Sequence, residues 1–185
     1  METYIDDFSL FAIEKMERQI KKYVWIFIVG LVLSGLSAIP LVWGVDFAVD
    51  ILDEIEFHGQ VFTFMKQVQN GLTFNEEHFP FMAYGTDWLA FAHFMFALLF
   101  VGLLFDAERN RFILRFGMVA CVLIIPTAVF FGHAREIPWL WRMIDCSFGV
   151  VGFAVLLKVE LLLNKLCTFK NKLKVDNQNY EKSAA

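Results

Sequence analysis

Six ionisable side chains in this sequence could form one polar site, because all of them fall near the same predicted end of long apolar segments. They are Asp87, His93, His133, Arg135, Arg142 and Asp145. An arginine can hold a phosphate or a carboxylate, and a histidine exchanges a proton near neutral pH. The site would then bind a lipid head group or a small anion. In this hypothesis Arg142 holds the anion, and Asp145 tunes proton exchange by His93.

The same residues also have a purely structural interpretation. Arg142 and Asp145 are three residues apart, so on a helix they can form an ion pair directly. Pairing removes much of the cost of roughly 3 kcal/mol that each charge carries near the centre of a membrane span. The pair would then specify the fold, with His93 hydrogen-bonded to it and no reaction catalysed.

Two cofactor hypotheses use the same histidines. His93 and His133 could ligate one haem, since both fall at a comparable depth on neighbouring segments. A zinc site for a membrane hydrolase would take His93, Asp145 and either Asp87 or His78. No His-x-x-x-His spacing supports zinc. We therefore predict no catalytic residue and no metal ligand, and the cofactor stays unknown.

The elements that must position these residues are membrane spans. A hydrophobic fraction of 58% and 22 Phe in 185 residues exceed the usual content of soluble domains. Four apolar segments are about long enough to cross a bilayer. They cover residues 23–43, 88–105, 112–131 and 137–163. The sequence predicts an all-α polytopic membrane protein, a four-transmembrane-helix bundle in one domain (1–170) with a polar tail (171–185).

The connection between the first two spans, residues 44–87, is too long to be a simple turn. From Asp46 to Gln69, apolar residues recur near helical spacing at Phe47, Ile51, Ile55, Phe62 and Met65. This pattern predicts one amphipathic helix, and its acidic face favours packing on the bundle over binding to anionic lipid. We expect residues 72–84 to form an irregular loop, residues 7–23 a separate short helix, and the tail after Lys170 to be loose.

Small residues predict which helix faces pack together. Three stripes recur at three or four residues: Gly30, Ser34 and Ala38; Ala90, His93 and Ala97; and Arg142, Asp145, Gly149 and Gly152. Small residues mark helix-to-helix contacts, so His93, Arg142 and Asp145 should point into the bundle.

Basic residues set the orientation. They cluster before the first span, between the second and third, and after the fourth, at Lys15, Arg18, Lys21, Lys22, Arg109, Arg111, Lys165, Lys170, Lys172, Lys174 and Lys182. The connection 44–87 contains Lys66 against eight acidic residues. The positive-inside rule therefore predicts cytoplasmic N- and C-termini and an extracytoplasmic connection.

Three stretches resemble those of a family of small bacterial four-span integral membrane proteins with no known activity. They are AYGTDWLAFAH (83–93), DAERNRFILRFGMVACVLIIP (106–126) and IPWLWRMIDCSFGVVG (137–152), with a looser likeness at LSGLSAIPL. The resemblance implies location in the bacterial inner membrane. It implies no activity and no cofactor, so no residue role is transferred.

Two functions from different classes follow. The first is a non-enzymatic binding or transport-related module with a polar site at the outer leaflet. Because four spans without an internal repeat are few for a transporter, transport would require a homo-oligomer. The second is an accessory subunit that docks on membrane-protein partners through the small-residue stripe and the acidic helix. A haem- or metal-binding enzyme is a minor alternative, and no basic patch indicates nucleic acid.

Overall fold

The computed structural model describes residues 7–184, and the side chains of residues 8–179. The described chain is almost entirely helical and contains no β-strand. Its elements are α1 (Asp7–Ala38), α2 (Leu41–Glu54), α3 (Gln60–His78), the 3-10 helix η1 (Pro80–Ala83), α4 (Tyr84–Phe105), α5 (Arg111–Ala134) and α6 (Trp139–Ala184). Helices α1, α4, α5 and α6 are long and apolar enough to cross a membrane. The predicted all-α polytopic fold is therefore confirmed.

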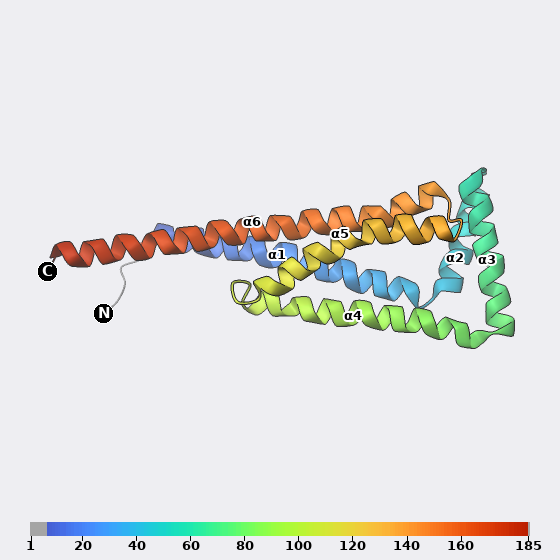
Figure 1. Cartoon of the computed structure of the whole chain (residues 1–185), viewed down its shortest axis with the longest axis horizontal. Coiled ribbons are helices and arrows are strands. Elements are labelled where there is room, and N and C mark those ends of the chain that lie inside the picture. Colours follow the sequence, from blue (N-terminus) through green and yellow to red (C-terminus); the bar gives the residue numbers. More distant parts are fainter. Residues whose placement is uncertain (1–6, 185) are drawn as a thin grey trace.

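The four long helices form an elongated bundle in which α1 is the central element (Figure 1). Helix α1 packs on both α4 and α6, and α5 packs on α6. Helices α4 and α5 meet near their short connection and diverge toward the opposite end (Figure 1). We call that opposite end the α2–α3 end, because α2 and α3 lie across it, and the other end the terminal end, because α1 begins and α6 ends there.

The first membrane helix both begins and ends at lower residue numbers than predicted. Helix α1 ends at Ala38 and α2 begins at Leu41, whereas we predicted a span to residue 43. Pro40 explains the break, because proline lacks a backbone N–H and disfavours helical conformation in the residue before it. The prediction of a separate helix over residues 7–23 is wrong, since α1 runs without interruption from Asp7.

The last helix is longer than predicted. Helix α6 has 46 residues, or about 69 Å at 1.5 Å per residue, against about 30 Å of hydrocarbon in a bilayer. It therefore extends well beyond the bundle at the terminal end (Figure 1). The prediction of a loose tail after Lys170 is wrong, because residues 171–184 continue this helix.

The buried core lies nearer the terminal end. The fully buried large side chains are Val24, Phe100, Leu103, Leu114, Leu156, Val159 and Leu163. All belong to the parts of α1, α4, α5 and α6 that lie toward the termini. At the α2–α3 end, α5 and α4 diverge and few large side chains are buried.

Glycines let the central helix approach its neighbours closely. A Cβ on Gly35 of α1 would lie 2.8 Å from Cε1 of Phe94 and 3.0 Å from Cβ of His93 on α4. A Cβ on Gly152 of α6 would lie 2.9 Å from Sγ of Cys121 on α5 and 3.3 Å from Cε2 of Phe27 on α1. Any residue larger than glycine at either position would require the neighbouring side chains to move.

One of the three predicted packing stripes is wrong. Gly30 and Ser34 are exposed, and nothing lies within 4 Å of a Cβ placed on Gly30. The packed face of α1 instead contains Val24, Ile28 and Gly35. Successive helical residues are 100° apart, so a stripe displaced by one residue faces a different direction. The stripes on α4 and α6 are confirmed at their small residues, since Ala90 and Ala97 are buried and Gly149 and Gly152 contact α5.

The predicted single amphipathic helix over residues 46–69 is two helices. The chain leaves helical conformation after Glu54, with positive φ at Glu56 (50°) and Gly59 (138°). Gln69 donates a hydrogen bond to Asp46 at 3.0 Å, and Lys66 pairs with Asp53 at 3.3 Å, so α2 lies against α3. Helix α3 runs through Asn70-Gly71 to His78 and η1 follows, so the predicted loop over 72–84 is also wrong.

Helices α2 and α3 contact the bundle through few side chains. The ring of Phe64 on α3 lies 5.8 Å from that of Trp141 on α6. Met65 and Val49 are buried, but Phe47 is 68% and Ile55 is 62% exposed. The apolar face of α2 is therefore largely uncovered, contrary to the expectation that it packs on the bundle.

The packing of α1 on α4 can be tested with two glycines of one helix. Replacing Gly35 with Ala should destabilise the protein by about 1–2 kcal/mol relative to Gly30→Ala, because only the first methyl group meets a neighbouring helix. Gly30→Ala should be neutral or slightly stabilising, since Ala favours helix over Gly. Unfolding in detergent measures both variants. Equal effects would contradict this register of α1 against α4.

Candidate functional site

The structure divides the six predicted site residues into two groups. Asp87 and His93 belong to α4, which packs mainly on α1. His133, Arg135, Arg142 and Asp145 belong to the end of α5, the turn after it and the start of α6, which we call the α5–α6 corner. Among the described side chains, no hydrogen bond or ion pair joins the two groups.

His93 lies at the contact between α4 and α1. Its Nδ1 donates a hydrogen bond to the carbonyl of Leu89 at 2.8 Å, within its own helix. Its Cβ lies against Gly35 of α1. The predicted hydrogen bond from His93 to an Arg142–Asp145 pair is therefore not formed. Since α4 and α5 diverge toward this end, the fold gives no support to a haem shared with the exposed His133 (Figure 1).

Asp87 is exposed in the first turn of α4. An acidic side chain there interacts favourably with the positive end of the helix dipole, which is a sufficient structural reason for its position. Among residues 8–179, no three His, Cys, Asp or Glu side chains are arranged to hold a metal ion. The zinc set of His93, Asp145 and Asp87 or His78 is thus not assembled.

Arg142 is directed toward α5 instead of along its own helix. A Cβ on Gly132 of α5 would collide with Cγ and Cδ of Arg142, so no side chain larger than that of glycine fits at position 132. The guanidinium carbon of Arg142 lies 5.2 Å from the ring centroid of Trp139, a cation–π distance. The glycine therefore makes the room in which the arginine lies.

The predicted ion pair between Arg142 and Asp145 does not form. In the described part of the chain, Arg142 has no ion pair, and its Nε atom is buried without a hydrogen-bond partner. A buried donor without an acceptor costs roughly 1–3 kcal/mol, and more when it is charged. An oxyanion placed at this nitrogen would remove that cost.

The turn from α5 to α6 places further basic groups at the corner. The backbone N–H of Ile137 donates to the carbonyl of Gly132 at 2.8 Å, and that of Arg135 donates to Phe131 at 3.0 Å. These bonds close the turn and bring Gly132 beside the first turn of α6. The side chains of His133 and Arg135 are exposed on it. Asp145 is partly buried and lies one turn deeper along α6.

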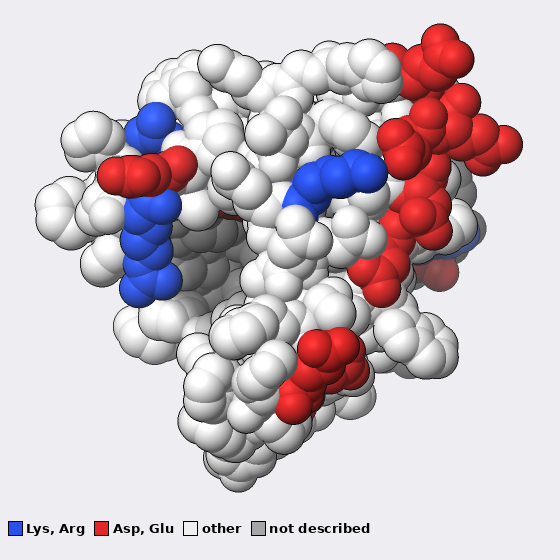
Figure 2. All heavy atoms as spheres, turned by 90° about the vertical axis from the view of Figure 1, so that its right-hand side faces the viewer, with Lys and Arg blue, Asp and Glu red and all other residues white. Residues whose placement is uncertain are grey.

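The α2–α3 end, on which the corner lies, carries many acidic side chains. Figure 2 shows acidic side chains gathered along one side of the α2–α3 end, and a hollow beside charged side chains on the other side. The exposed acids of α2, α3 and the turn between them are Asp50, Asp53, Glu54, Glu56, Glu76 and Glu77. They repel a small anion that approaches through water. A phosphate that arrives from within the bilayer, already beside the helices, avoids that approach.

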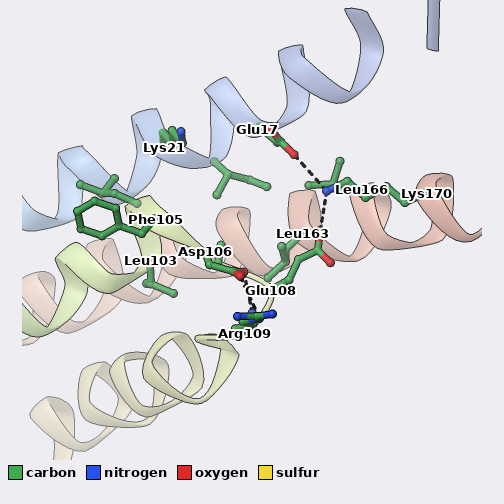
Figure 3. A pocket seen from close by; sticks show the side chains of 13 residues that line it. Glu17, Lys21, Leu103, Phe105, Asp106, Glu108, Arg109, Leu163, Leu166 and Lys170 are labelled. Atoms are coloured by element: carbon green, nitrogen blue, oxygen red, sulfur yellow. Dashed lines mark hydrogen bonds and ion pairs between the residues drawn. The ribbon is translucent and has the colours of Figure 1, made fainter. Parts of the chain in front are cut away.

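A second polar region, which the sequence analysis missed, lies at the terminal end. Lys170 of α6 forms ion pairs with Glu17 of α1 at 3.1 Å and with Glu108 of the α4–α5 connection at 2.8 Å. Figure 3 shows Lys170 between these two carboxylates, at the edge of a pocket of about 390 Å³. We call these two ion pairs the Lys170 clamp, because they connect α1, the α4–α5 connection and α6. In the sequence, Lys170 stands out only as one of the basic residues that indicate orientation.

Helices α5 and α6 also meet at a partly buried carboxylate near the terminal end. Glu160 lies 3.7 Å from Arg111 and 3.4 Å from Arg115. One sequence signal could have found it, namely an acidic residue inside an otherwise apolar part of the last span.

The fold and these sites define a multi-pass, all-α membrane protein with four candidate spans and polar groups at both ends of its bundle. Comparisons of the chain with protein families, with curated proteins and with solved structures found no match. The resemblance of residues 83–93, 106–126 and 137–152 to small bacterial membrane proteins stays an expectation.

The Lys170 clamp predicts a local effect on the α4–α5 connection. Lys170→Gln should lower stability by about 1 kcal/mol, since partly exposed ion pairs contribute little, and should speed hydrogen exchange in residues 106–110. Arg18→Gln removes a more exposed pair with Glu14 and serves as the control. Unchanged exchange in the connection of Lys170→Gln would mean that the clamp does not hold it.

Proposed function

We propose that this protein is a non-enzymatic binding module of the bacterial inner membrane that holds the phosphate of a phospholipid head group at the α5–α6 corner. The observation that carries this proposal is the buried, unpartnered Nε of Arg142. Guanidinium groups bind phosphate oxygens through parallel, charge-assisted hydrogen bonds. Arg135 and His133 would assist from the turn.

The position of the corner favours a lipid over a free anion. Trp139 stacks on Arg142, and tryptophan is enriched where membrane spans meet the head groups. The exposed acids of α2 and α3 disfavour a small anion approaching from water, whereas a head group reaches Arg142 sideways. Asp145 and Glu136 lie near Arg142 in the sequence, and their carboxylates would pair with an amine on the same head group.

The distribution of basic residues supports cytoplasmic termini. Lys and Arg are numerous at the terminal end, whereas the α2–α3 end has Lys66, Arg135 and Arg142 among many acids. The site would then face the outer leaflet of the inner membrane. This location rests on the positive-inside rule and on the resemblance described above.

A second candidate function is that of an accessory subunit of a larger membrane complex. The exposed apolar residues of α2 favour it: Trp43 is 79% exposed, and Phe47 and Ile51 follow at intervals of four residues. A partner would cover this face beside the acids Asp50 and Glu54. On this alternative, charge reversal at both acids abolishes co-purification of the partner.

Native mass spectrometry tests the phospholipid proposal. We expect protein extracted in mild detergent to retain a phospholipid, and Arg142→Gln to lose it by about tenfold or more, because a charge-assisted bond contributes about 1.5–3 kcal/mol. Arg142→Lys should retain part of the binding. Lys66→Gln, at the same end but paired with Asp53, is the control. Equal retention by the Arg142→Gln variant and the unaltered protein would refute the proposal.

The orientation predicts which surface is accessible from outside the cell. In a variant with its three cysteines replaced, Thr73→Cys on α3 should react with a membrane-impermeant maleimide in spheroplasts, because Thr73 is exposed at the α2–α3 end. Gln178→Cys on α6 should react only after lysis. The reverse pattern would place the site in the inner leaflet.

A further inference from the structure

Three charged side chains, Arg111 and Arg115 of α5 and Glu160 of α6, lie together at the opposite end from the α5–α6 corner. Arg111 and Arg115 are one turn apart, and both approach the same carboxylate oxygen, Oε1 of Glu160. Two guanidinium groups against one carboxylate leave a net positive charge. The side chain of Arg115 is 64% exposed, while that of Glu160 is 14% exposed.

The group is not internally complete. Arg111 uses one nitrogen for a contact of 3.4 Å with Sγ of Cys167, which is a weak acceptor. The guanidinium donors therefore outnumber the strong acceptors around them, and an additional oxyanion would be accommodated.

An apolar groove begins at Arg115 and continues along the helix. It has a volume of about 340 Å³ and is lined by Arg115, Met118, Val119, Val122, Leu123 and Phe153. The residues from α5 are three or four apart, so they form one face of the helix from Arg115 to Leu123, about 12 Å long. Phe153 of α6 forms the other side.

The depth of the groove matches one leaflet. Arg115 lies one turn after the start of α5, and the groove runs from there toward the middle of the helix. If α5 crosses the bilayer, this places Arg115 near the boundary between head groups and acyl chains. A basic group at one end of an apolar groove matches the two parts of a single phospholipid. Basic pockets between spans commonly bind anionic head groups in this way.

We propose that Arg111, Arg115 and this groove form a second lipid site, which binds an anionic phospholipid in the leaflet at the terminal end. The phosphate lies on the two arginines, and one acyl chain lies between α5 and Phe153. A free phosphate would use the arginines but leave the groove empty. The site is separate from the α5–α6 corner and does not depend on the function proposed for it.

Because the site contains charges of both signs, removing a positive charge should lower lipid binding and removing the negative charge should raise it. The protein is exchanged into nanodiscs of phosphatidylglycerol and phosphatidylcholine, and the lipids that it retains after extraction are measured by native mass spectrometry. Arg115→Gln should lower retained phosphatidylglycerol about fivefold, the contribution of one basic residue near a membrane surface. Glu160→Gln should raise it, because the competing carboxylate loses its charge. A fall or no change in Glu160→Gln would overturn the proposal.

Two further variants separate the site from general effects. Lys158→Gln removes an exposed cation from the same span as Glu160 but outside the groove, and should leave retention unchanged. Val122→Trp fills the groove without changing charge at a residue that is already exposed, and should lower retention. If Val122→Trp retains lipid normally, or if inorganic phosphate displaces the bound species, the groove is not part of a lipid site and the proposal fails.

A variant that fails to fold is recognised by its loss of unfolding cooperativity in detergent. In that case Arg115→Lys, which keeps the charge, replaces Arg115→Gln, and Val122→Trp provides the loss of binding. Retention of phosphatidylglycerol by Arg115→Lys together with loss in Val122→Trp supports the site, and the opposite pair of results overturns it.

Discussion

The close approach of α1 to its neighbours is the constraint on which the rest of this bundle depends. Lipid tails are as apolar as leucine, so helices in a bilayer gain little from burying hydrophobic surface and instead associate through close van der Waals packing. Because Gly35 has no side chain, α4 can approach α1 closely. Gly152 of α6 lies against Phe27 of α1 and Cys121 of α5 for the same reason. Because α4 and α5 diverge, α1 is the element that links α4 to the α5–α6 pair.

This packing explains why charged side chains have different surroundings at the two ends of the molecule. At the terminal end the core is tight, and the partly buried carboxylate of Glu160 and the ammonium of Lys170 each meet two partners of opposite charge. At the α2–α3 end the helices separate, and Arg142 lies in the space left by Gly132 with its Nε unsatisfied. A charge without a protein partner in a low-dielectric region favours a ligand, whereas neutralised charges stabilise a fold. The protein thus has a neutralised clamp at Lys170, and it keeps positive charge without a full set of protein partners at Arg142 at one end and at Arg111 and Arg115 at the other.

Local sequence patterns predicted each element better than they predicted contacts between elements. Hydrophobic length identified the four spans, but it carried the first one to residue 43, beyond the break at Pro40 where α1 has already ended. The apolar spacing from Asp46 to Gln69 was compatible with one helix, and the break at Glu56 and Gly59 became visible only in the backbone angles. Two helices could fold back on each other because Asp46 and Asp53 meet Gln69 and Lys66, residues 23 and 13 positions away.

The sequence by itself determined that this is an all-α membrane protein with four spans, because the length and apolarity of a segment decide whether it can cross a bilayer with its backbone hydrogen-bonded. It also identified Arg142 as a residue of interest. Only the tertiary structure decided which charges meet. Arg142 and Asp145 are near in sequence yet unpaired, whereas Arg115 and Glu160 are 45 residues apart and in contact. Rotation of each helix about its axis sets these pairings, and that rotation follows from packing between helices at residues such as Gly35 and Gly132.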